Sequence, residues 1–125
     1  MTPLSKSEEQ LMEFIWSKKF IYLNELIDCF EKPHPASSTI ATLLKRMQTK
    51  GYVGFNITGN SRAYYAMVTK DKYFSKQVRG MINNFFDNSP AQFASFFTKK
   101  MEMSRAQLLE LRKMIDDEIT KKSIK

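Results

Sequence analysis

Cysteine and histidine are nearly absent from this sequence. One cysteine, Cys29, and one histidine, His34, occur in 125 residues. A lone cysteine excludes a disulfide within the chain, which fits a reducing compartment and predicts a cytoplasmic location. The two residues are too few for a zinc-type ligand set within one chain. With a single histidine, at position 34, neither a Cys–His nor a Ser–His–Asp catalytic arrangement is credible. We therefore predict no metal, no cofactor and no enzymatic activity.

Long apolar runs are missing as well. No stretch approaches the roughly 18 consecutive apolar residues of a membrane-spanning helix, and the N-terminus lacks the apolar core of a signal peptide. We expect no membrane insertion. Only four glycines are present, and none belongs to a glycine-rich phosphate-binding loop. Cys29 lies within an apolar pattern and is expected to be buried, whereas His34 lies between two prolines and is expected in an exposed turn.

Acidic residues are absent from one long segment. All six Asp and Glu residues before Asp71 lie within residues 1–31, and none occurs from Lys32 to Lys70. A surface that meets phosphate needs cations and excludes carboxylates, so this segregation and the net charge of +7 favour a nucleic acid as partner. Many basic proteins bind no nucleic acid, so the prediction depends on which elements carry the cations. The basic residues of the segment are Lys32, Lys45, Arg46, Lys50, Arg62 and Lys70.

Three helices are predicted in the first 51 residues. Ser7 and Gln10 match a capping box ahead of apolar residues at helical spacing, which predicts a helix that ends near residue 19. A very short extended piece leads into a second, short helix over residues 23–30, which the prolines that follow end. A third helix begins near Ser37 and stops at Gly51. The second and third helices with their short connection match a helix-turn-helix.

After Gly51 the apolar spacing changes from helical to alternating. Residues 52–57 and 62–68 are predicted strands joined by a turn, and three helices followed by a hairpin is the winged-helix order. Helical spacing returns at Asp71, with cap signals at Ser89 and Ser104 for two further helices. The predicted fold is mostly α with a small β hairpin: a winged helix-turn-helix over residues 1–70, followed by a helical dimerisation domain over residues 71–125.

The exposed face of the predicted third helix carries small hydroxyl side chains and cations. Its inward stripe is predicted to consist of Ile40, Leu43, Leu44 and Met47. Small side chains let a helix enter the major groove, and Arg46 suits a phosphate or a guanine edge. Arg62 near the hairpin tip suits a phosphate or the minor groove. An ordinary solvated helix face and a mobile turn are the alternatives. The predicted DNA-binding residues are Ser38, Thr39, Thr42, Lys45, Arg46, Thr49, Asn60 and Arg62.

The second half of the chain has apolar helical faces that need a partner, because about fifty residues of helix form a poor core alone. We predict that two copies pair through these faces on a twofold DNA site, since one winged domain covers only a few base pairs. The alternative is that the faces pack on the winged domain of the same chain. The predicted dimer-interface residues are Phe74, Val78, Met81, Ile82, Phe85, Phe86, Phe93, Phe97, Leu108, Leu111 and Ile115.

Four segments of the sequence, taken together, resemble those of a known protein family. They are Leu4 to Trp16, Ser38 to Gly51, Arg62 to Tyr65, and Ser104 with Glu110-Leu111-Arg112. With these residues the chain resembles the penicillinase-repressor family, which includes the BlaI, MecI and CopY branches. The resemblance implies a dimeric repressor that reads double-stranded operator DNA with its third helix, at the positions of Ser38, Thr39, Thr42 and Arg46. Ala41 stands where relatives carry a larger polar residue, which leaves the operator sequence open.

The resemblance also implies a sensor protease as a possible partner, and cleavage of an Asn–Phe bond in the dimerisation domain. The matching pair here is Phe96–Phe97, so the asparagine is absent and induction by this cleavage is not supported. The copper branch carries cysteines near its C-terminus, and residues 100–125 contain none. The sequence therefore predicts a dimeric operator-binding repressor. The alternatives are a winged-helix protein-interaction module without sequence-specific DNA binding, and a nonspecific chromosome-coating protein.

Overall fold

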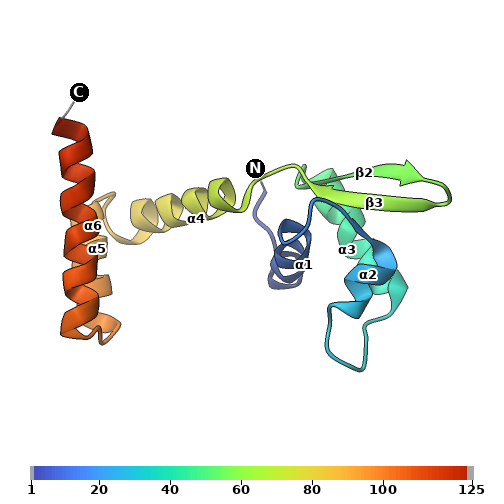
Figure 1. The fold of residues 1–125 in the computed structure, drawn as a ribbon, viewed down its shortest axis with the longest axis horizontal. Helices are drawn as coiled ribbons and strands as arrows, with labels where there is room; N and C mark the ends of the chain where they lie inside the picture. The colour runs from blue at the N-terminus through green and yellow to red at the C-terminus, as the bar shows by residue number, and fades with distance from the viewer. Residues whose placement is uncertain (1, 124–125) are drawn as a thin grey trace. The chain divides into compact units, whose positions relative to one another are not determined.

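The computed structural model describes residues 2–123 and divides into two units, the first ending at Ser75 and the second beginning at Lys76. The first unit contains α1 (Lys6–Trp16), β1 (Ile21–Tyr22), α2 (Leu23–Asp28), α3 (Ser37–Thr49), β2 (Val53–Thr58) and β3 (Ser61–Ala66) (Figure 1). Helix α4 (Lys70–Phe85) begins in the first unit and ends in the second, where α5 (Pro90–Lys100) and α6 (Arg105–Ser123) follow. The predicted class, mostly helical with a small sheet after the N-terminal helices, is confirmed.

The sheet has three antiparallel strands in the order β1-β3-β2. Strands β2 and β3 form the predicted hairpin, with Phe55 opposite Tyr64 and Ile57 opposite Arg62. The short extended piece before α2 is β1, which pairs Ile21 with Tyr64. The sequence predicted this piece but not its pairing, because no local pattern shows which strand lies beside it.

The start of α1 differs from the prediction. Ser5, not Ser7, is the N-cap: its Oγ accepts a hydrogen bond from the Glu8 N–H at 3.2 Å, and Glu8 Oε1 accepts one from the Ser5 N–H at 2.8 Å. The helix ends at Trp16, where Ser17 Oγ donates to the Phe14 carbonyl at 2.6 Å. The capping box predicted at Ser7 and the predicted end near residue 19 are therefore wrong.

Apolar side chains from α1, α2, α3 and the sheet form one core in the first unit. Trp16 is half-buried at its edge and donates from Nε1 to the Val68 carbonyl at 2.8 Å. Tyr73, in the first turns of α4, packs its ring 5.7 Å from that of Tyr52, and its hydroxyl donates to Glu9 Oε2 at 2.6 Å. Burial and then the Glu9 carboxylate raise the pKa of Tyr73. The buried members of the core are Leu4, Leu11, Met12, Ile15, Ile21, Leu26, Ile40, Leu44, Met47, Tyr52, Val53, Tyr64, Val68 and Tyr73.

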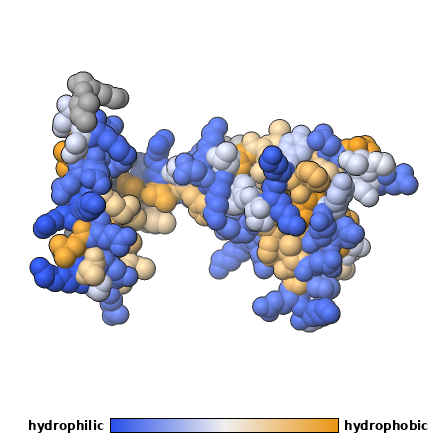
Figure 2. Space-filling model, viewed as in Figure 1, coloured by the Kyte–Doolittle hydropathy of each residue, from blue (hydrophilic) through white to orange (hydrophobic). Residues whose placement is uncertain are grey.

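The second unit has helices but little interior. Ser89 caps α5 ahead of Pro90, and Ser104 and Gln107 form a capping box at α6, as predicted. The ring of Phe86, the residue after α4, meets rings of α5 in a small cluster of Phe86, Phe93, Phe96 and Phe97. Among residues 76–123, however, no side chain is buried. The visible surface of this unit is mostly hydrophilic, with separate apolar patches (Figure 2).

Candidate nucleic-acid interface

Helix α3 separates an apolar side from a polar side. Ile40, Leu44 and Met47 are buried, and Leu43 is half-buried. The predicted contact residues of this helix are all exposed, which places them together on the side opposite the core: Ser38, Thr39, Thr42, Lys45, Arg46 and Thr49. This face has no carboxylate, because α3 contains no acidic residue.

Two threonine hydroxyls on α3 are fixed by the helix itself. Thr42 Oγ1 donates to the Ser38 carbonyl at 2.9 Å, and Thr49 Oγ1 donates to the Lys45 carbonyl at 3.1 Å. Since each hydroxyl hydrogen is used within the helix, the oxygen that remains is an acceptor, and the hydroxyl's orientation is set. An acceptor of this kind suits the amino group of adenine or cytosine, and a threonine methyl suits that of thymine.

The cations of the acid-free segment fall into two groups. Lys50 Nζ lies 2.6 Å from Glu8 Oε1, and Lys70 Nζ lies 2.9 Å from Glu13 Oε2, so both are paired with carboxylates of α1. Within residues 2–123, no carboxylate lies within 4.0 Å of the other four, Lys32, Lys45, Arg46 and Arg62. Counting charges along the sequence therefore overstated the free positive charge. Of these four side chains, α3 and the hairpin present three: Lys45, Arg46 and Arg62.

The β2–β3 hairpin is the wing. Its two-residue turn, Gly59 and Asn60, is exposed, and Gly59 has a φ of 63°, a left-handed conformation that favours glycine. Arg62 is exposed on β3, and its guanidinium carbon lies 4.2 Å from the centroid of the Phe55 ring. Ile57, opposite Arg62, is 70% exposed. The sequence placed Phe55 and Ile57 in the first strand of the hairpin but not among the predicted DNA-binding residues, although the alternation of Val53, Phe55 and Ile57 continues past the core.

The residues predicted for the dimer interface differ in their surroundings. Phe74 belongs to the first unit, with its ring 5.9 Å from Trp16 and 5.2 Å from Tyr73. In the second unit, Val78, Met81, Phe85, Leu108 and Ile115 are exposed, with Phe85 at 78%. The remaining five are half-buried within their own chain: Ile82, Phe86, Phe93, Phe97 and Leu111.

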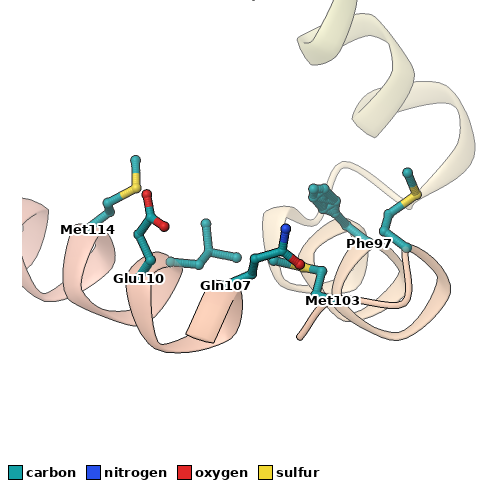
Figure 3. Close-up of a pocket in the computed structure, with 7 residues that line it drawn as sticks. Phe97, Met103, Gln107, Glu110 and Met114 are labelled. Atoms are coloured by element: carbon teal, nitrogen blue, oxygen red, sulfur yellow. The ribbon is translucent and has the colours of Figure 1, made fainter. Parts of the chain in front are cut away.

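An apolar groove runs between α5 and α6 in the second unit. It measures about 370 Å³, and Phe97, Met103, Gln107, Glu110 and Met114 line it together with Met101 and Leu111 (Figure 3). The pair that the sequence resemblance matched to a cleavage position, Phe96–Phe97, lies inside α5. Its peptide bond is part of a helix, and Phe97 borders the groove.

Other candidate sites carry little chemistry. Cys29 follows α2 as its C-cap and is exposed, so the expectation that it is buried is wrong: α2 ends one residue earlier, and Cys29 falls outside its inward face. His34 is exposed, with Nε2 4.0 Å from Asp28 Oδ1.

Among the described residues, no three His, Cys, Asp or Glu side chains are grouped to hold a metal ion. None of the helices there is long and apolar enough to cross a membrane.

A helix-turn-helix with a wing, whose outer helix is cationic and free of carboxylates, defines a winged-helix transcriptional regulator. The Penicillinase repressor family profile matches residues 4–117, and the chain belongs to that family. It is 25% identical over 114 residues to the methicillin resistance regulatory protein MecI of Staphylococcus aureus strain N315, covering 90% of this chain and 93% of the relative.

Two penicillinase repressors are also similar to this chain. The protein of Staphylococcus aureus is 27% identical over 120 residues, and that of Bacillus licheniformis is 23% identical over 120 residues. Each alignment covers 95% of this chain and 94% of the relative. The family consists of DNA-binding transcriptional repressors and not of enzymes.

Proposed function

We propose that this protein is a cytoplasmic repressor that binds a twofold operator in double-stranded DNA as a homodimer. The observation that carries the proposal is the exposed face of α3, where Lys45 and Arg46 have no carboxylate partner among residues 2–123 and stand beside small hydroxyl side chains. A duplex offers phosphates for the cations and base edges for the hydroxyls.

Each part of the surface then has a role set by its chemistry. Residues in the first turns of a recognition helix reach base edges, so Ser38, Thr39 and Thr42 are the proposed readers of sequence. Lys45, Arg46 and Thr49 follow toward the C-terminal half, where the cations meet phosphate and Arg46 also suits a guanine edge. Asn60 and Arg62 on the wing contact the backbone beside the helix.

The second unit supplies the twofold symmetry. Its apolar side chains are exposed or half-buried in the single chain, and no residue from 76 to 123 is buried. A unit of this size needs to bury more apolar surface to be stable. The surfaces that a second copy covers are the exposed face of α4 and α6 and the groove between α5 and α6.

Arg46→Ala is expected to weaken operator binding about tenfold to a hundredfold, because a specific arginine contact is worth about 1–3 kcal/mol. Thr42→Ala is expected to weaken it less and to relax the preference at one base pair. The measurement is a mobility-shift titration on the promoter region of the protein's own gene, with a scrambled duplex of equal length alongside.

The matched control for Arg46→Ala is Lys113→Ala, which removes one exposed cation from α6. It is expected to bind like the wild type. Equal affinity of the wild type for the operator and the scrambled duplex would contradict sequence-specific repression. Binding of a protein partner that Arg46→Ala leaves intact, without any operator binding by the wild type, would favour the interaction-module alternative instead.

A further inference from the structure

The wing carries a stacked pair of side chains, Phe55 and Arg62, of which the proposed function uses only Arg62. The guanidinium carbon of Arg62 lies 4.2 Å from the centroid of the Phe55 ring, within the range of a cation–π interaction. The register explains the contact: Phe55 lies opposite Tyr64 and Ile57 lies opposite Arg62, so all four side chains share one face of the hairpin. Phe55 and Arg62 are diagonal neighbours across the two strands.

The Phe55 ring is held from the core side. It is half-buried, packs against the core of the first unit, and lies 5.9 Å from the ring of Tyr64, which is buried. The ring is therefore fixed between the core and the exposed Arg62. Within residues 2–123, no carboxylate comes within 4.0 Å of Arg62, so the ring is the partner that orients this cation.

A stacked guanidinium keeps its hydrogen-bond donors free. The five N–H groups of arginine lie in the guanidinium plane, and an aromatic ring occupies only one face of that plane. The stack thus limits the rotamers of a long side chain without using the donors that a phosphate needs. Ordering the side chain before binding lowers the entropy that the complex must lose.

We propose that Phe55 is a positioning residue for DNA binding, whose ring holds the Arg62 guanidinium ready to donate to a phosphate of the duplex. The role rests on the proposed function, because it requires that the wing meets DNA. It predicts that Phe55 acts on affinity only through Arg62 and touches no base.

The test is a double-mutant cycle with Phe55→Leu, Arg62→Ala and the double variant, measured by operator titration. Phe55→Leu keeps an apolar side chain and is expected to weaken binding about two- to fivefold, the usual size of an exposed cation–π contact. In the Arg62→Ala background the same change is expected to have no effect. Phe55→Tyr retains a ring and is expected to restore wild-type affinity.

Two further measurements separate positioning from folding. Thermal unfolding confirms that each variant is folded at the titration temperature. The side-chain proton resonances of Arg62 in the free protein are expected to be shifted upfield by the Phe55 ring, and to lose that shift in Phe55→Leu.

Three results would overturn the positioning role while the wild type still binds its operator. They are wild-type affinity of Phe55→Leu, an equal loss in both backgrounds, and Arg62 resonances that Phe55→Leu leaves in place. If the wild type binds no operator, the proposed function is wrong and the positioning role is wrong with it.

Discussion

Ile115→Glu is expected to convert the protein to a monomer and to lower its operator affinity at least about a hundredfold. Ile115 is exposed on α6, on the face that the proposed dimer buries. An unpaired carboxylate in an apolar interface has lost its hydration without gaining a partner, which costs several kcal/mol. Two linked winged units bind DNA about 10²–10⁴ times more tightly than one, because the first contact raises the effective concentration of the second unit at its half-site. A monomer loses this gain in affinity.

Sedimentation velocity and the operator titration measure the two effects on the same sample. Thr120→Glu is the matched control, because it introduces the same charge on α6, and Thr120 lies five residues on, on nearly the opposite side of the helix. It is expected to remain a dimer with wild-type affinity. A monomeric wild type, or a dimeric Ile115→Glu variant with unchanged affinity, would show that this face of α6 does not form the interface.

Glu8→Gln is expected to destabilise the first unit by about 2 kcal/mol, because it removes the carboxylate from a charge-assisted hydrogen bond with the half-buried Lys50, and hydrogen bonds to charged groups contribute about 1.5–3 kcal/mol. Glu8 is 1% exposed, and its Oε1 accepts from Lys50 Nζ at 2.6 Å as well as from the Ser5 N–H. Lys50 also donates to the Pro3 carbonyl at 3.2 Å. The pair thus joins the N-terminal segment and α1 to the end of α3.

Urea unfolding followed by the fluorescence of Trp16 reports on this unit specifically, since Trp16 is the one tryptophan of the chain and lies in the first unit. Glu13→Gln is the matched control: it breaks the Lys70–Glu13 pair, in which both side chains are about half exposed. Exposed pairs contribute about 0–1 kcal/mol, so this control is expected to unfold nearly like the wild type. Equal stability of Glu8→Gln and the wild type would contradict the structural role of the pair.

The same carboxylate gives the first unit an acid-dependent stability. Burial alone raises the pKa of Glu8, but the hydrogen bond from Lys50, those with Ser5 and the Lys50 charge outweigh it and hold the pKa below its ordinary 4.5. A lowered pKa in the folded state means that the contribution is present above pH 4.5 and is lost as the pH falls through the folded value. In Glu8→Gln this part of the pH dependence is expected to disappear from urea unfolding measured across that range.

The sequence predicted those features that local spacing determines. The apolar period of α3, the alternation in the hairpin and the caps at Ser89 and Ser104 all depend on residues a few positions apart. The exposed set on α3 followed directly from its period. These features place the candidate DNA-binding face without any knowledge of tertiary contacts.

The features that the sequence did not predict depend on residues far apart in the chain. Ser5 and Ser7 both precede an acid or amide by three positions, and the choice of Ser5 goes with the pairing of Glu8 to Lys50, 42 residues away. The same pair removes Lys50 from the free cations, as Glu13 removes Lys70. The stack of Arg62 on Phe55 could be predicted only with knowledge of the register between β2 and β3. Local patterns contain no information about any of these contacts.

The central claim, that α3 and the wing bind duplex DNA, is tested most directly by amide NMR spectra of the labelled protein with and without its operator duplex. We predict that the resonances of α3 between Ser38 and Thr49, and those around Asn60 and Arg62, shift on binding. Core residues such as Leu11 are expected to stay in place. Shifts confined to other surfaces, with α3 unchanged at a saturating duplex concentration, would contradict the account.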